Sequence, residues 1–420
     1  MPPKAVEQEK TPQQKLEDGR KALQQEGDRR YPNMDELPEF TDGIVLANIR
    51  EYYERVPEAP KEPPAGGSTG WSPIFTQVGP ILIALNPFVN NFPMYERCWQ
   101  DVYHKAGSAG AIQTAWRTFG PHCFGTIEQV YQELKRASQQ SVVICGESGA
   151  GKTFTNKLML DYLLDKGQAL ERSVAPRKSM VNDRGDPASD ETKVAVASAN
   201  ELLEAFGNAK TGRNDNSSRF GKFTQLYFNA NKDDQLVVHY PKVKTYLLER
   251  SRVVTVPKGE RNYHIFHYLA NADALKENGG DASQATFDYI KEAQSVKKNE
   301  FKNGEALPFD DVDGYKVIKQ QMADAGFSEE YTKNVFQLIT GILYLGNATF
   351  VDGDDSSSQA CSLEASSSAT FKIACELLGV SVDTMTEALT HQMMPTTNAE
   401  GKLELKLVPS YKKSDAEAQR

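Results

Sequence analysis

Residues 141–153, SVVICGESGAGKT, are the stretch that most constrains the fold. The run 141–145 is apolar and rich in β-branched residues, which predicts one short buried strand of a parallel sheet. Gly146–Thr153 then satisfies the pattern GxxxxGK[ST]. Apolar side chains recur at helical spacing after it, at Leu158, Met159, Tyr162 and Leu163. The glycine turn is therefore predicted to join a strand to a helix.

That arrangement suits phosphate binding. Glycines allow successive backbone N–H groups to line a nest for phosphate oxygens, and the helix N-terminus adds further donors. Lys152 supplies a mobile charge for the β- and γ-phosphates, and the Thr153 hydroxyl can enter a Mg²⁺ shell. The pattern predicts ATP or GTP binding. A glycine turn that binds nothing is the alternative, and the motif alone leaves the reaction open.

Composition sets the broad class of the protein. With 420 residues, of which 39% are hydrophobic, the chain can bury a large core and has room for two or three domains. The net charge of −9 argues against nucleic-acid binding as the main activity. The five cysteines are scattered without metal-binding spacing, which is typical of a reduced intracellular protein. No run approaches the length of a membrane-spanning helix, and the N-terminus lacks a signal-peptide pattern.

Periodicity predicts mingled helices and strands. Residues 1–33 form a polar tail, either a solvated helix or a disordered segment, and 167–191 form a polar loop that is solvated or contacts a regulator or partner. Helices are expected within 34–55, at 121–138, from the glycine turn to about 166, and at 194–210, 263–271, 312–325, 329–346 and 368–378. Strands are expected at 79–85, 223–228, 236–240 and 243–248. Strict βαβ alternation is missing, so we expect a mixed central sheet with a large helical insertion.

A second polar cluster lies in residues 206–223, FGNAKTGRNDNSSRFGKF. Asn214, Asn216, Ser217 and Ser218 are short hydrogen-bonding side chains that suit a polyanion or a metal ion better than a core. The neighbouring Arg219 can pair with phosphate or carboxylate. An ordinary polar turn is the alternative interpretation.

Taken together, the motifs resemble the myosin motor domain. The resemblance is carried by GESGAGKT, LLEAFGNAKT (202–211), NDNSSRFGKF, YLLERSRVV (246–254) and GERNYHIFHYL (259–269), and it covers roughly residues 35–415. It implies an α/β P-loop NTPase, with a nucleotide-binding part over 34–260 and a mostly helical upper-cleft part over 261–420. It also implies an ATPase that uses ATP and Mg²⁺, with the actin filament as partner and a place in the cytoplasmic actin cytoskeleton. Light chains are implied only if a lever follows downstream.

The resemblance assigns roles to individual residues. The phosphate loop comprises Gly146, Glu147, Ser148, Gly149, Ala150, Gly151, Lys152 and Thr153. In the first switch, Asn214 would contact phosphate oxygens, Ser217 would lie by the γ-phosphate near the attacking water, and Ser218 would join Thr153 around Mg²⁺. Arg219 would form an ion pair with the second switch. Asn86 and Pro87, with Tyr95, would form the adenine-side loop.

The sequence also departs from the family pattern. The second switch, a DxxGFE-like motif, is expected after residue 420, so we expect the N-terminal part of a motor. The alternative function is a truncated, non-hydrolysing module that binds nucleotide or actin. Phe154 stands where the family usually carries an acid, and the adenine-side loop is one residue longer than usual.

Two further segments bear on function. Residues 392–413 resemble the loop that meets actin, with Lys402, Lys406, Lys412 and Lys413 facing an acidic filament; a solvated β-turn is the alternative. A different P-loop enzyme, such as a kinase or a transporter ATPase, would need an acidic Walker-B strand. The acids of PFDDVDG (308–314) follow no apolar strand, which disfavours that class.

Overall fold

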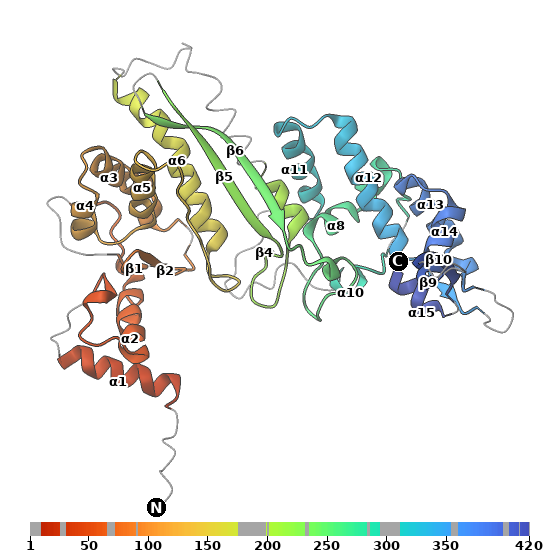
Figure 1. The fold of residues 1–420 in the computed structure, drawn as a ribbon, viewed down its shortest axis with the longest axis horizontal. Coiled ribbons are helices and arrows are strands. Elements are labelled where there is room, and N and C mark those ends of the chain that lie inside the picture. The colour runs from red at the N-terminus through yellow and green to blue at the C-terminus, as the bar shows by residue number, and fades with distance from the viewer. Residues whose placement is uncertain are drawn as a thin grey trace, which may run out of the picture. The chain divides into compact units, whose positions relative to one another are not determined.

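The structure is a computed structural model that describes residues 10–25, 31–64, 72–89, 91–174, 199, 201–231, 235–283, 286–294, 311–353, 360–397, 403–410 and 412–419. The chain divides into two compact units, and the division passes through two long strands. Unit 1 comprises residues 1–182 and 226–241, and unit 2 comprises residues 183–225 and 242–420. Figure 1 colours the chain from red at the N-terminus to blue at the C-terminus.

Unit 1 begins with two helices, α1(Pro12–Gln25) and α2(Asp42–Tyr53), which pack side by side (Figure 1). Their shared apolar cluster contains Leu23, Tyr31, Ile44 and Ala47. Part of the segment predicted as a polar tail is therefore a packed amphipathic helix, because its small and apolar side chains recur on the face turned toward α2. Short 3₁₀ turns follow at η1(Met34–Glu36), η2(Val56–Glu58) and η3(Pro93–Tyr95).

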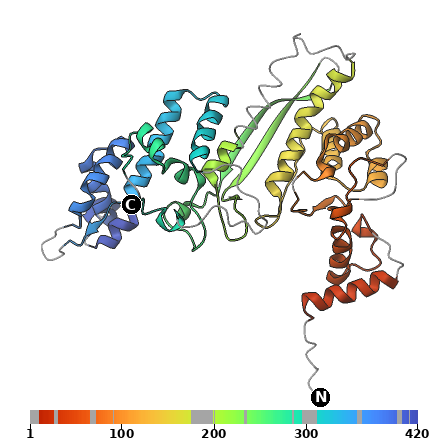
Figure 2. The same cartoon turned by 180° about the vertical axis from the view of Figure 1, so that it is seen from behind.

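The core of unit 1 lies between the helices of residues 97–134 and the long helix that follows the glycine turn. A hairpin of β1(Phe75–Val78) and β2(Ile81–Ala84) leads into α3(Arg97–Ser108), α4(Ile112–Phe119), α5(Cys123–Leu134) and α6(Lys152–Val174). Side chains of α3, α5 and α6 share one buried cluster that includes Trp99, Phe124 and Tyr162. Residues of β5(Gly221–Ala230) and β6(Leu236–Tyr246) pack against it, and Figure 2 shows these helices from behind.

Unit 2 has a helical core around two long helices. The polar segment 206–223 contributes β3(Asn208–Ala209) and β4(Ser217–Ser218), and η4(Arg250–Val253) follows β6. The core is built from α8(His264–Leu269), α9(Ala272–Glu277), α11(Asp311–Asp324) and α12(Glu329–Gly346), with α10(Lys291–Gln294) nearby in the chain. Fully buried aromatic rings such as Phe287, Phe336 and Tyr344 fill the space between them.

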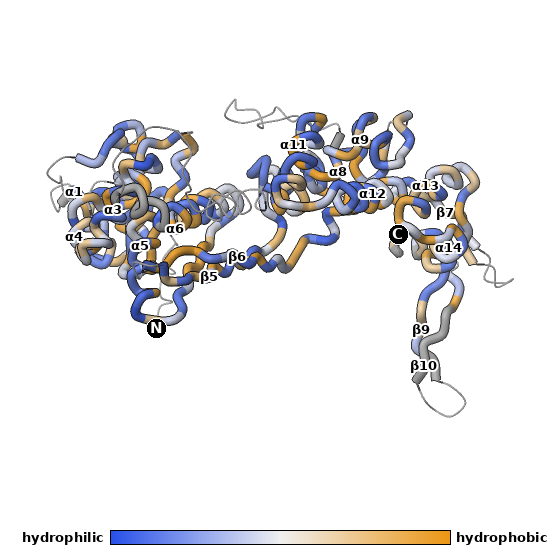
Figure 3. Tube along the Cα trace, turned by 90° about the horizontal axis from the view of Figure 1, so that it is seen from above, coloured by the Kyte–Doolittle hydropathy of each residue, from blue (hydrophilic) through white to orange (hydrophobic). Residues whose placement is uncertain are grey.

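The end of unit 2 carries a smaller cluster and a long hairpin. Helices α13(Ser368–Leu378), α14(Val382–Thr390) and α15(Lys413–Gln419) surround β7(Phe350–Val351), β8(Ser362–Leu363) and η6(Ala365–Ser367). The strands β9(His391–Thr397) and β10(Leu403–Pro409) pair in antiparallel register. Figure 3 shows this hairpin extending away from α13 and α14.

The predicted central sheet is not seen in the described part of the chain. The strands there form five two-stranded sheets, and residues 141–145 belong to none of them. The prediction of a buried strand at 141–145 is wrong for this structure: Val142 is 41% exposed and Val143 is 86% exposed. β-Branched residues favour a strand only when neighbouring strands pair with it, and the described residues provide no such neighbour.

Most helix predictions are confirmed. α11, α12 and α13 match the predicted 312–325, 329–346 and 368–378 within one residue at each end. The predicted strand at 243–248 is wrong as a separate element, because β6 continues to Tyr246 in one piece. Residues 194–198 and 200 of the predicted helix 194–210, and residues 175–191 of the predicted polar loop, lie outside the described residues. Among the described helices, none is long and apolar enough to cross a membrane.

Candidate functional site

The glycine turn of residues 146–151 is folded by backbone conformations that need glycine. Gly149 and Gly151 have φ angles of +86° and +91°, a region that residues with a Cβ rarely adopt. The Ala150 N–H donates to the carbonyl of Glu147 at 3.2 Å, which closes the turn. Helix α6 starts at Lys152, so the turn lies directly at the N-terminus of a long helix. This is the geometry in which backbone donors and the helix dipole attract an anion.

The Lys152 ammonium lies over the same turn. Its Nζ donates to the carbonyl oxygens of Gly146 at 2.7 Å and Glu147 at 2.8 Å. The two carbonyl oxygens thus hold the positive charge of Lys152 over the glycine turn. Thr153, the next residue, has an exposed side chain. A hydroxyl at this position can serve as a Mg²⁺ ligand, so the residues present fit a Mg–nucleotide at this turn.

Asn86 connects the end of β2 to the glycine turn. Its Nδ2 donates to the Gly149 carbonyl at 2.9 Å, and its Oδ1 accepts from the Phe88 N–H at 2.9 Å. Tyr53 of α2 donates its hydroxyl to the Asn86 carbonyl at 3.2 Å. The structure therefore brings Asn86, predicted from the sequence on the adenine side, against the phosphate loop. Pro87, which follows it, is buried.

Tyr95 lies on the same side of unit 1, in an aromatic group. Its ring packs edge-on against Phe154 of α6 at 5.1 Å between centroids and against Phe92 at 5.4 Å. Burial raises the pKa of the Tyr95 phenol far above its ordinary value. Tyr95 thus reaches the residue that directly follows Thr153. Sequence reasoning noted Phe154 as a departure but gave it no role; its signal was an aromatic residue adjacent to the phosphate-loop threonine.

The other predicted site residues lie in unit 2, on the short β3–β4 ladder. Asn208 pairs with Ser218 and Ala209 with Ser217. Strand alternation sends the two serines to opposite faces: Ser217 is buried and Ser218 is exposed. The Ser218 hydroxyl donates to the Phe220 carbonyl at 3.3 Å. The exposed hydroxyl is the one predicted to join a Mg²⁺ shell.

The turn before β4 is shaped by asparagine side chains. Asn214 Oδ1 accepts from the Asn216 N–H at 3.0 Å, an Asx turn. The Asn216 side chain contacts α8 of the same unit, where its Oδ1 lies 3.0 Å from His264 Nε2. Lys210, which is buried, forms an ion pair with Asp215 at 2.9 Å. These contacts give the loop a defined conformation, and they do not decide between a ligand-binding loop and an ordinary polar turn.

Arg219 is held by a residue that sequence reasoning missed. Its Nε donates to Glu249 Oε2 at 2.6 Å, and its Nη1 lies 3.3 Å from Ser217 Oγ. Glu249 also accepts from Arg252, and Arg252 pairs with Glu260 at 2.9 Å. We predicted a partner for Arg219 in the second switch, whereas the structure supplies one from the YLLERSRVV segment. The pattern ERSR, an acid followed by two arginines, was the available signal.

The segment predicted to meet actin is the hairpin β9–β10. Met394 and Lys406 lie opposite each other in its register. Lys402 lies outside the described residues, whereas Lys412 and Lys413 are exposed beside β10. The Lys413 N–H donates to Asp352 Oδ1 at 2.8 Å. Seven residues of each strand pair in the described part, and both the actin contact and the alternative of a solvated β-turn stay predictions.

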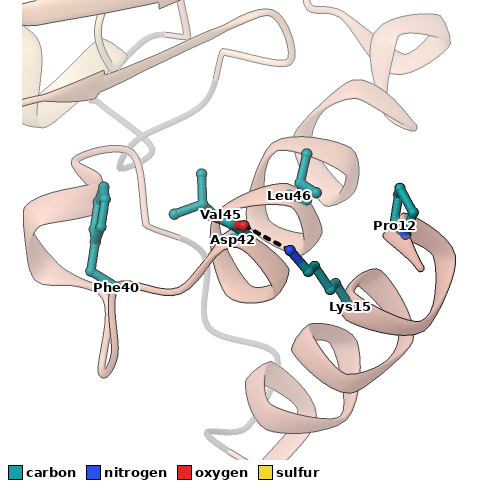
Figure 4. Close-up of a pocket in the computed structure, with 6 residues that line it drawn as sticks. All are labelled: Pro12, Lys15, Phe40, Asp42, Val45 and Leu46. Atoms are coloured by element: carbon teal, nitrogen blue, oxygen red, sulfur yellow. Dashed lines mark hydrogen bonds and ion pairs between the residues drawn. The ribbon is translucent and has the colours of Figure 1, made fainter. Parts of the chain in front are cut away.

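One hollow of about 410 Å³ lies elsewhere in unit 1 (Figure 4). Its lining consists of Pro12, Lys15, Phe40, Asp42, Val45 and Leu46, and Lys15 pairs with Asp42 across it at 3.2 Å. None of the predicted site residues lines it. Its one cation is already paired with a carboxylate, so the hollow offers no unmatched charge for a polyphosphate.

Comparisons with known proteins agree on one family. Residues 70–419 match the model of the myosin head, the motor domain. The chain is 35% identical over 291 residues to Myosin-14 of Arabidopsis thaliana, an alignment that covers 68% of this chain and 17% of that protein.

Two further relatives come from other kingdoms. Unconventional myosin-Ic of Rattus norvegicus is 32% identical over 323 residues, covering 76% of this chain and 27% of that protein. Myosin-2A of Naumovozyma castellii is 33% identical over 324 residues, covering 77% of this chain and 19% of that protein. The aligned region is therefore about a quarter or less of each relative's length.

Proposed function

The chain belongs to the myosin head (motor domain) family, and on that premise we propose that it binds Mg·ATP and hydrolyses it in a cycle coupled to actin-filament binding. The observation that carries the proposal is the phosphate loop, with Lys152 Nζ on the carbonyls of Gly146 and Glu147 at the N-terminus of α6. In a cytoskeletal motor, closure of the switch loops around the γ-phosphate supplies the conformational signal.

Each predicted residue has a task in this proposal. Lys152 and the backbone N–H groups of 146–153 neutralise the β- and γ-phosphates, while Thr153 and Ser218 provide hydroxyls for Mg²⁺. Asn214 contacts phosphate, and Ser217 positions the attacking water. When bound, Mg²⁺ would neutralise part of the negative charge on the phosphates. Phosphoryl transfer to water depends mainly on such positioning and charge neutralisation.

Arg219 would close the site against a carboxylate. In this structure its guanidinium is already oriented by Glu249 and by Ser217 Oγ. The arginine is therefore preorganised at the end of β4, and a second acidic group could share it. Preorganisation of this kind lowers the cost of closing a site, because the side-chain entropy is already lost.

Actin-stimulated ATP turnover of the purified chain tests the proposal. We expect the chain to bind Mg·ATP and to release phosphate faster in the presence of filaments, with both properties lost in Lys152→Ala. Binding without any turnover would instead favour the non-hydrolysing nucleotide- or actin-binding module. Absence of both nucleotide binding and filament binding would overturn both functions.

A further inference from the structure

Phe154 lies beside the phosphate loop as a half-exposed aromatic side chain. It is the third residue of α6, directly after Thr153, and it is 50% exposed. A phenylalanine exposed at the mouth of a polyanion site gains nothing from phosphate. One edge of its ring is nevertheless fixed, because the ring packs against Tyr95 at 5.1 Å and 61°.

Tyr95 is itself anchored, so the pair is rigid. Its ring contacts Phe92 at 5.4 Å and Phe75 at 6.4 Å, and both phenylalanines are at most 2% exposed. Tyr95 therefore supports Phe154 from the core of unit 1. The part of Phe154 that is not covered by Tyr95 forms an aromatic surface one residue from the threonine proposed to bind Mg²⁺.

The side-chain amide of Asn86, which the sequence predicts on the adenine side, already makes its hydrogen bonds within the protein. Both ends of the Asn86 amide are engaged, Nδ2 with the Gly149 carbonyl and Oδ1 with the Phe88 N–H. Asn86 thus shapes the phosphate loop and the turn after β2, and its carbonyl end is not offered to the edge of a base. Recognition by ring contact, in contrast to recognition by hydrogen bonds, accepts any base, since every base has an aromatic face.

We propose that Phe154, supported by Tyr95, is a base-contacting residue of the nucleotide site and makes nucleotide affinity depend on an aromatic contact that does not discriminate between purines. The inference rests on the proposed function, because it places the phosphates on the loop 146–153. It concerns a position at which this chain departs from the acid usual in its family.

Equilibrium titration of the purified chain with Mg·ATP, Mg·GTP and Mg·tripolyphosphate tests it. We expect Phe154→Ala to weaken ATP and GTP by a similar factor, about tenfold, and to leave tripolyphosphate unchanged. Phe154→Leu keeps the apolar bulk without the ring and should lose most of the same affinity. Phe40→Ala, which removes another exposed phenylalanine of unit 1, should change none of the three.

The outcomes separate the two proposals. Tripolyphosphate binding with unchanged ATP affinity in Phe154→Ala would overturn the base contact and leave the phosphate loop standing. A wild-type preference for ATP over GTP of a hundredfold or more would also overturn it, since ring contact does not read the base edge. Failure of the wild-type chain to bind tripolyphosphate or either nucleotide would overturn the proposed function itself.

Discussion

Arg219 and Glu249 form an ion pair within unit 2, with Nε of the arginine 2.6 Å from Oε2 of the glutamate. The same oxygen lies 2.7 Å from Arg252 Nε. One carboxylate therefore joins the residue that follows β4 to the segment that leads into α8. Arg252 is only 3% exposed, so its charge depends on these acidic partners.

Glu249→Gln should destabilise unit 2. The change removes one negative charge from between two guanidinium groups, and we expect the free energy of unfolding to fall by about 1–3 kcal/mol. Urea denaturation, with hydrogen exchange at the amides of Ser217 and Arg219, measures it. Asp313→Asn is the matched control, because Asp313 and Lys316 are 3.9 Å apart and 61% and 71% exposed. An equal loss in both variants would contradict the assignment.

The contribution of Glu249 should depend on pH. Burial raises the pKa of its carboxyl, but hydrogen bonds from Arg252 and Arg219 outweigh burial, so the pKa lies below its ordinary value of about 4.5. A lowered pKa in the folded state stabilises the fold above about 4.5, and the stabilisation is lost as the pH falls through the folded value. The difference in unfolding free energy between wild type and Glu249→Gln should therefore shrink below that pH. A difference that stays constant would show that charge is not involved.

His104 should make unit 1 sensitive to mild acid. Burial, together with the smaller effect of the Lys166 charge, lowers its pKa from 6.5 to about 4. As the pH falls from 6.5 towards 4, the unfolded chain binds a proton that the folded chain refuses, so stability falls with pH by at most about 1.4 kcal/mol per unit. His104→Gln should reduce this slope in denaturation curves recorded between pH 7 and 4. An unchanged slope of unfolding free energy against pH in His104→Gln would contradict the prediction.

Lys166 and Glu128 form a buried ion pair between α6 and α5. Tyr162 donates its hydroxyl to the same Glu128 oxygen at 2.8 Å, and Gly107 leaves the space that the carboxylate occupies. Lys166→Ala should cost about 3–5 kcal/mol, because it leaves Glu128 buried and unpaired.

The double variant Glu128→Met with Lys166→Met provides the comparison. It removes both charges and keeps the volume, so we expect a smaller loss of unfolding free energy than for Lys166→Ala alone. Thermal or urea unfolding of the single and the double variant compares their free energies of unfolding. A double variant that is less stable than the single one would show that packing around Tyr131 and Tyr162, and not charge, governs the site.

Gly19 should be irreplaceable at the contact between α1 and α2. A Cβ at this position would lie 2.0 Å from the Gly43 carbonyl oxygen. Gly19→Ala gains helix propensity of about 1 kcal/mol but forces the helices apart, and overpacking costs roughly 1–3 kcal/mol. We expect faster hydrogen exchange in residues 12–25, whereas Glu17→Ala on the exposed face should leave exchange unchanged. Slower exchange in Gly19→Ala would refute the close approach.

Local signals explain which elements could be predicted. α12 begins after Ser328, whose hydroxyl accepts from the Tyr331 N–H, and α13 ends at Gly379 in the left-handed conformation. These caps and the helical periodicity act within a few residues, so the sequence reveals them. The prediction of a strand at 141–145 is wrong because a strand is stable only when neighbouring strands pair with it. No local sequence pattern shows whether such neighbours exist.

The residues of the candidate site also fall into those that the local sequence predicts and those that only folding brings together. The loop 146–153 could be predicted because its chemistry lies in consecutive residues, and the structure adds that Asn86 supports it. The partner of Arg219 could not be predicted from the sequence, since Glu249 lies 30 positions away along the chain. The role of Phe154 likewise depends on Tyr95, which the chain brings to it only by folding.

The most direct test of the account is equilibrium binding of Mg·ATP to the purified chain and to Lys152→Ala. A charge-assisted hydrogen bond contributes about 1.5–3 kcal/mol, so we expect the variant to bind roughly 10- to 150-fold more weakly. Lys157→Ala, on the exposed side of α6, should bind as the wild type does. Equal affinity of wild type and Lys152→Ala would contradict the claim that this loop holds the phosphates.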